Sequence, residues 1–220
     1  MSKYLVNCIK CKNQNEVFRL TCKYCGAFLH NKISNINLWN MFYTFLESPS
    51  SAIISIIQSE KKNFSFLLII LGTIKLSLLK HITLKYFEVD SFTAASIFIS
   101  SSIKIILLVF VIKGIQYLKD YKIRIEDIFA TISYSLFIEV ISLFIILPIE
   151  YSFFGESLFS FNPSPFFLKP FTAYIFFSLE IIFLLFTIYY FYLVIEIFFN
   201  KRIISMFISI LFFILLFSFL

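Results

Sequence analysis

The chain has 220 residues, of which 60% are hydrophobic and only 15% are charged. Soluble domains are nearer half apolar and a quarter charged, so this composition excludes an ordinary soluble domain. The net charge of +6 lies at the ends of long apolar blocks, where basic residues orient membrane helices and contact anionic lipid, so no nucleic-acid partner is expected.

Residues 1–32 are polar and basic, and they lack the apolar core of a cleavable signal peptide. We therefore expect the N-terminus to stay in the cytoplasm. In that reducing compartment, paired cysteines are metal ligands more often than disulfides. All four cysteines of the chain stand in this region, as two Cys-x-x-Cys pairs: Cys8, Cys11, Cys22 and Cys25.

Two such pairs supply the four thiolates that a tetrahedral zinc ion needs. Gly26 directly follows the second pair, where the chain must turn sharply. Lysines in or beside the pairs offset the negative charge of a zinc tetrathiolate: Lys10, Lys12 and Lys23. The pattern predicts a structural zinc ribbon over residues 1–32, with a short strand at residues 16–20 between the pairs.

Three alternatives use the same residues. Iron in a rubredoxin-like site has the same ligands as zinc, so ligand type does not separate the two metals. His30 follows closely enough to replace one cysteine, or it is an exposed linker histidine. A redox-active dithiol is disfavoured because no thioredoxin-like βαβ pattern surrounds the pairs.

Residues 33–63 are predicted to form a linker and two short amphipathic helices. Apolar residues share one face of residues 38–47, as in a helix with one buried side. Ser48 and Pro49 then suit the start of a second helix, which runs to Gln58. Trp39 is placed as an interfacial anchor. Either the two helices lie on the inner leaflet or they pack on the membrane domain.

Residues 64–220 are predicted to form a membrane domain of five transmembrane helices, which makes the fold class an all-α polytopic membrane protein. Pro148 is predicted to end the third helix. The five predicted spans cover residues 64–79 or a little beyond, 92–112, 127–147, 171–199 and 203–220.

The loops predict the orientation. Lys and Arg concentrate in the N-terminal region and in the loops after the second and fourth spans. Basic residues favour the cytoplasmic side, so we expect the N-terminus inside and the C-terminus outside. The loop at residues 149–170 is rich in Phe and Pro and is expected to lie along the outer interface. The expected location is a prokaryotic inner or plasma membrane.

Five charged residues fall inside the apolar blocks: Lys75, Lys104, Glu139, Glu180 and Glu196. An unpaired charge costs about 2.5–3.5 kcal/mol at a helix centre, so these groups are expected to pair. The favoured pair joins Lys104 to Glu139 or Glu180. The pair is either a polar path for ions or a structural contact, and Lys75 and Glu196 lie near enough to helix ends to extend toward the interface.

No catalytic or cofactor-binding residues are predicted. The chain has two histidines and four glycines, and it contains neither a metalloprotease His-Glu-x-x-His pattern nor a glycine-rich phosphate loop. An enzyme is therefore not expected.

From Leu38 onward the chain resembles the Yip (Ypt-interacting protein) domain family of five-span membrane proteins. The resemblance is carried by Leu38-Trp39, by the stretch from Leu46 to Ser50 (Leu-Glu-Ser-Pro-Ser), by the run from Ile53 to the Ser-Glu-Lys-Lys-Asn sequence, by Tyr134 and by five spans with a basic second loop. The resemblance implies a role in membrane organisation or trafficking without catalysis. The placement of a zinc ribbon before such a domain resembles a prokaryotic arrangement.

The predicted function is that of a non-enzymatic membrane adaptor or organiser whose ribbon docks a cytosolic or membrane protein. The chain is compatible with a homo-oligomer. The alternative is a small transporter or channel component built around Lys104, Glu139 and Glu180.

Overall fold

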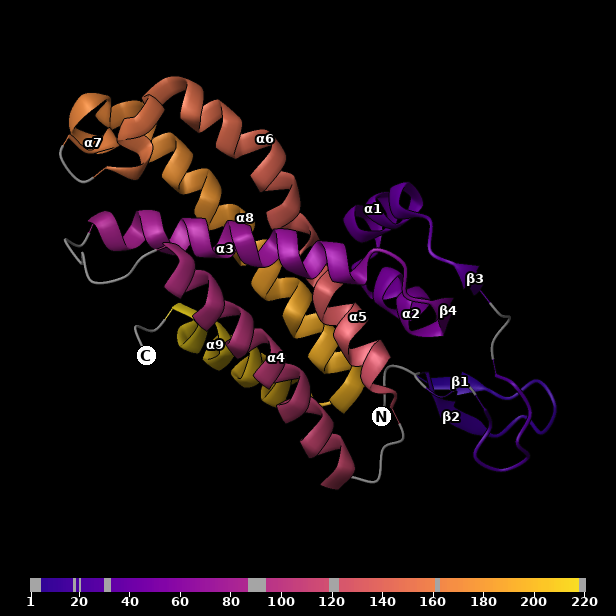
Figure 1. Cartoon of the computed structure of the whole chain (residues 1–220). Helices are drawn as coiled ribbons and strands as arrows, with labels where there is room; N and C mark the ends of the chain where they lie inside the picture. The colour runs from indigo at the N-terminus through magenta and orange to yellow at the C-terminus, as the bar shows by residue number, and fades with distance from the viewer. Residues whose placement is uncertain are drawn as a thin grey trace.

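The computed structural model describes residues 5–17, 19, 21–29, 33–86, 94–118, 123–160 and 163–217. Figure 1 shows a helical bundle with a small strand-containing module beside one end. The elements are β1 (Leu5–Asn7), β2 (Gln14–Glu16), β3 (Ile33–Asn35), α1 (Leu38–Glu47), α2 (Pro49–Gln58), β4 (Ser59–Lys61), α3 (Ser65–Tyr86), α4 (Ala94–Leu118), α5 (Ile125–Ser135), α6 (Phe137–Phe154), a 3-10 helix (Gly155–Phe159), α7 (Pro165–Leu168), α8 (Pro170–Phe199) and α9 (Arg202–Phe217).

Four helical segments of the described chain are long and apolar enough to cross a membrane: Ser65–Thr83, Ala95–Ile115, Ile125–Phe159 and Pro170–Phe199. They correspond to the first four predicted spans. Helix α9 has 16 residues and so a length of about 24 Å, which is less than a hydrocarbon core of about 30 Å. The predicted fifth span continues into residues 218–220, which lie outside the described residues.

The prediction that Pro148 ends the third span is wrong. Pro148 lies inside α6, and the helix is interrupted earlier, at Leu136 between α5 and α6. Pro148 is exposed. Its ring removes one backbone hydrogen bond and crowds the carbonyl of residue 144, but membrane helices tolerate such a proline. The interruption at Leu136 coincides with a close helix contact: a Cβ added to Gly72 of α3 lies only 2.6 Å from the Leu136 Cβ.

Helix α3 runs through the middle of the bundle. In Figure 1 it has α6 on one side and α4 and α9 on the other, while α8 crosses behind it. Helix α3 contacts α4, α5 and α6. The described part of the segment at residues 149–170, which begins with the last residues of α6, is largely helical. Phe154 and Leu158 from this segment are buried against Ile82 of α3 and Ala173 of α8, so it closes one end of the bundle.

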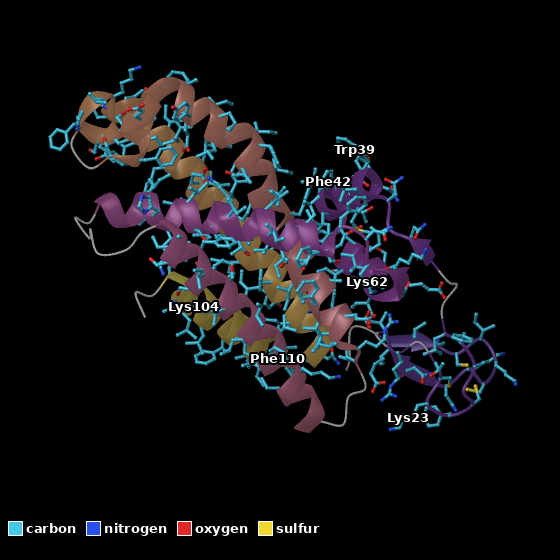
Figure 2. All side chains as sticks on the ribbon, viewed as in Figure 1. Lys23, Trp39, Phe42, Lys62, Lys104 and Phe110 are labelled. Carbon is cyan, nitrogen blue, oxygen red and sulfur yellow. The ribbon has the colours of Figure 1, made fainter. Side chains whose placement is uncertain are left out.

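Helices α1 and α2 pack on the bundle, which supports the second of the two alternatives for them. Phe45 is fully buried, and its ring centroid lies 5.3 Å from that of Tyr190 in α8. The buried face of α2 contributes Ala52, Ile53, Ile56 and Ile57. The opposite face of α1 stays outside: Figure 2 shows Trp39 at the edge of the molecule, and its side chain is 79% exposed.

Candidate metal centre and buried charges

The four predicted cysteine ligands lie together. Their sulfur atoms are all within 4.8 Å of one another. The Cys8 Sγ–Cys25 Sγ and Cys11 Sγ–Cys22 Sγ distances are both 3.5 Å. Sulfurs bound to one tetrahedral zinc ion at about 2.3 Å are separated by about 3.8 Å, so this donor set fits a metal of zinc's size. His30, the alternative ligand, lies outside the described residues.

The two Cys-x-x-Cys turns share a backbone conformation. Lys12 and Gly26 each follow the second cysteine of a pair, and both have left-handed φ values, of 57° and 71°. Their amides donate to the Cys8 and Cys22 carbonyls at 2.9 and 3.0 Å respectively. From the sequence, a sharp turn was predicted only after the second cysteine pair, because Gly26 stands there. The first turn holds a lysine in a conformation that glycine adopts more readily.

The predicted strand at residues 16–20 is misplaced. Strand β2 is Gln14–Glu16, and it pairs antiparallel with β1 so that Val6 faces Asn15. The first cysteine turn thus joins two strands of a hairpin, and the chain has left the strand by Val17, which packs into the main core of the bundle. Phe18 and Leu20 lie outside the described residues.

Asn15 is a supporting residue that the sequence reasoning missed. Its side chain is buried, and its Nδ2 donates to Cys22 Sγ at 3.4 Å and to the Asn13 carbonyl at 2.9 Å. Its Oδ1 accepts from the Lys23 amide at 2.9 Å. Hydrogen bonds of this kind orient metal ligands, so Asn15 connects the two cysteine turns through both ends of its amide.

The environment of Cys22 favours its thiolate. Burial raises the pKa of the Cys22 thiol, but the amides of Cys25 and Tyr24 donate to the sulfur and help to bring the pKa down to about 6. The amide of Asn13 lowers the pKa of Cys11, whereas burial and the neighbouring thiols raise it to about 12. The amides of Cys11 and Lys10 likewise lower the pKa of Cys8. Interacting thiols titrate as a set, so the cluster as a whole favours the thiolates that a metal needs.

The surface of this cysteine module (residues 5–29) is both apolar and basic. Ile9, Tyr24 and Phe28 are 80%, 65% and 64% exposed. Lys10, Lys12 and Lys23 are exposed beside them, and Figure 2 shows Lys23 at the outer edge of the module. Ile9 and Tyr24 therefore lie on the surface of the module, where they can contact another protein.

The buried charges do not pair as predicted. Glu180 Oε1 lies 2.6 Å from Lys75 Nζ, with both side chains at most 4% exposed, and it also accepts from Ser142 Oγ at 3.0 Å. The prediction that Lys104 is the partner of Glu139 or Glu180 is wrong. Lys104 Nζ donates to the Leu215 carbonyl in α9 at 2.8 Å.

The other two glutamates also have partners inside the protein. Glu139 Oε1 accepts from Thr187 Oγ1 at 2.8 Å, and Glu196 Oε1 lies 3.2 Å from Arg202 Nε. Lys75, predicted to extend toward the interface, is instead fully buried. The positions of the charged residues in the sequence did not show which of them lie at the same level of the helical bundle and can therefore pair.

A small cavity of about 20 Å³ adjoins the Lys75–Glu180 pair, and Glu150 is its third charged lining residue. This volume suits about one water molecule. Glu139 Oε2 and Glu180 Oε2 are buried and have no hydrogen-bond partner among the described residues. The region is therefore a compact polar cluster and, over the part of the chain described, does not widen into a pore at this point.

A separate cluster of charged residues, Lys62, Arg124 and Asp127, connects the end of α2 to the start of α5. Lys62 Nζ lies 2.9 Å from Asp127 Oδ1, and Arg124 Nη2 approaches the same oxygen at 2.9 Å. Lys62 Nζ also donates to the Ser59 carbonyl at 2.9 Å. Burial lowers the pKa of Lys62, although the Asp127 carboxylate opposes this shift. Tyr134 Oη donates to the Asn63 carbonyl at 2.5 Å, so α5 also holds the residue that follows Lys62.

Comparison of the chain with family models, with curated proteins and with solved structures finds no match.

Proposed function

We propose that this chain is a non-enzymatic, Yip-like integral membrane protein that acts as a membrane adaptor or organiser. Five spans anchor it, with the N-terminus in the cytoplasm and the C-terminus on the opposite side. The cysteine module is a zinc ribbon, and it docks a protein partner in the cytosol or at the membrane surface.

The exposed surface of the module carries this proposal. A metal site that only holds a small fold together does not require large apolar side chains on the outside. Ile9 and Tyr24 nevertheless project from the two cysteine turns and are mostly exposed. Aromatic and aliphatic anchors of this kind supply most of the binding energy in protein interfaces. The surrounding lysines favour a partner whose apolar patch is bordered by acidic residues.

The zinc assignment is supported by the chemistry of the site. Four thiolates at tetrahedral spacing form a soft donor set of the kind that binds structural zinc. The module is also too small to be stable through its own core, since its central cluster contains little more than Cys8, Cys22 and Leu29. A bound metal would supply that missing free energy of folding.

The alternative, a transporter or channel component, has less support. A conducting path needs ionisable groups around a wet cavity, whereas Lys75 and Glu180 contact each other directly. The cavity beside them has room for about one water molecule. We expect purified protein in liposomes to give no proton or cation flux above protein-free vesicles. A flux that Glu180→Gln abolishes would favour the alternative.

The docking proposal is tested by changing the module surface without changing the metal site. The variant Ile9→Ser/Tyr24→Ser is expected to keep its zinc and its membrane insertion but to lose the partners that wild type retains after affinity purification in mild detergent. Thr21→Ala, an exposed position on the same module, is the matched control and should keep them. Cys22→Ser is expected to lose both zinc and partners while still inserting into the membrane.

An unchanged list of partners in Ile9→Ser/Tyr24→Ser, with zinc quantified in the same samples, would contradict the docking role. Loss of partners in Thr21→Ala as well would show that the assay reports general damage to the module.

A further inference from the structure

Helices α6 and α8 meet at a carboxyl group that has no counter-charge. Glu139 of α6 is fully buried. In the described part of the chain, its one polar contact joins Oε1 to Thr187 Oγ1 of α8 at 2.8 Å, and Oε2 has no hydrogen-bond partner. Burying an ionised carboxylate without a counter-charge is so costly that such a group takes up a proton instead.

The charged side chains around Glu139 do not offset its charge. The lysine of this cluster, Lys75 of α3, lies 2.6 Å from Glu180 of α8. Ser142, one turn beyond Glu139 on α6, donates to the same Glu180 oxygen as Lys75 does. Glu150, which lines the cavity beside the Lys75–Glu180 pair, is a third carboxyl and brings no positive charge. The positive charge of Lys75 is therefore already used by Glu180.

The hydrogen bonds of Thr187 indicate which oxygen holds the proton. Thr187 Oγ1 lies 2.8 Å from Glu139 Oε1 and 3.1 Å from the carbonyl oxygen of Phe183, one turn earlier on α8. A threonine hydroxyl has a single hydrogen to donate, and both of these oxygens are acceptors when Glu139 is ionised. With a proton on Glu139 Oε1, this oxygen donates to Thr187, and the Thr187 hydrogen goes to the Phe183 carbonyl. Both contacts are then complete hydrogen bonds.

We propose that Glu139 is a proton-binding site, which holds one proton at Oε1 at neutral pH while Glu180 stays ionised beside Lys75. The bound proton leaves the Glu139–Thr187 contact between α6 and α8 neutral. Its loss puts a second negative charge one turn from the Ser142–Glu180 contact and weakens the packing of the two helices. The proposal concerns proton binding without conduction, and it does not rest on the adaptor function.

The test uses full-length protein in lipid vesicles at neutral pH and records infrared difference spectra. A protonated carboxyl has a carbonyl stretching band that a carboxylate lacks. Wild type is expected to show this band, and Glu139→Gln is expected to lose it. Glu196→Gln is the matched control, because Glu196 is also buried on α8 but lies 3.2 Å from Arg202 Nε. This control should lose carboxylate bands and keep the protonated-carboxyl band.

A second variant tests the position of the proton. Thr187→Val removes the hydroxyl that accepts from the protonated Glu139, so the carboxyl band is expected to remain but to move to higher frequency, as for a carboxyl that lacks a hydrogen-bond acceptor. A merely structural role of Glu139 would not move this band, and the comparison with wild type remains informative if Glu139→Gln fails to fold.

Three outcomes would overturn the proposal. The first is a protonated-carboxyl region that is identical in wild type and Glu139→Gln. The second is an equal loss of the band in Glu196→Gln, which would show that the band does not report on Glu139. The third is a band that is absent or unshifted in Thr187→Val.

Discussion

The Lys75–Glu180 pair yields the sharpest prediction about stability. The Nζ–Oε1 distance is 2.6 Å, and the two side chains are 1% and 4% exposed. The change Glu180→Gln removes the negative charge but keeps a side chain of similar size that can still accept a hydrogen bond from Ser142. The perturbation therefore tests the charge and leaves the packing almost unchanged.

The expected loss is about 3–5 kcal/mol in the free energy of unfolding, because the change leaves the Lys75 ammonium buried without its counter-charge. The intact pair itself contributes much less, since its attraction is offset by the cost of removing both charges from water. The double variant Lys75→Met/Glu180→Met removes both charges and fills the space with apolar groups. It is therefore expected to recover most of the loss.

The measurement is equilibrium unfolding of purified protein in mixed micelles of mild detergent and SDS, followed by circular dichroism. Lys104→Met is a matched control, because it also removes a lysine from a membrane helix but breaks a contact with a backbone carbonyl. We expect it to cost about 1.5–3 kcal/mol, the range for a hydrogen bond made by a charged group, and so less than Glu180→Gln. The reasoning is refuted if Glu180→Gln lies within about 1 kcal/mol of wild type, or if the double variant is as unstable as the single one.

Three further predictions follow from backbone geometry and topology. Gly72→Ala is expected to lower the free energy of unfolding by about 1–3 kcal/mol, because its Cβ would clash with Leu136 at the break between α5 and α6. Gly114→Ala is the control: no atom lies within 4 Å of the added Cβ, so this variant should be neutral or slightly stabilising in the same assay. Lys12→Gly is expected to stabilise the ribbon by about 1 kcal/mol, because glycine adopts the left-handed conformation more readily than lysine, and so to slow the release of zinc to a chelator. Gly26→Ala is expected to destabilise the ribbon by about 1 kcal/mol and so to speed release. A tag fused after Leu220 is expected to be inaccessible from the cytosol in sealed cells; its labelling from the cytosolic side would contradict the five-span topology.

The cysteine site was predictable because its ligands are close together in the sequence. Two Cys-x-x-Cys pairs separated by ten residues can reach one metal ion in almost any compact arrangement of a short hairpin. Asn15 was not predictable in the same way. Its role depends on the register of β1 and β2, which directs its side chain toward Cys22, and nothing in the local sequence specifies that register.

The membrane helices show the same division. The first four spans follow from long apolar runs, because every backbone polar group in lipid must be paired within a helix. The position of the break in the third span depended on a contact instead. Pro148 is a local signal, but it lies on an exposed face where the helix tolerates it, while Leu136 meets the backbone of α3 at Gly72.

The amino-acid sequence by itself determined the composition of the membrane blocks, the set of cysteine ligands and the presence of costly charges among apolar residues. These are properties of single segments, and short-range chemistry is enough to specify them. Only the tertiary structure decided that Glu180 pairs with Lys75 and not with Lys104, and that α1 and α2 rest on the bundle. Such contacts join residues far apart in the chain, so they depend on the relative depth and rotation of whole helices, which no local pattern encodes.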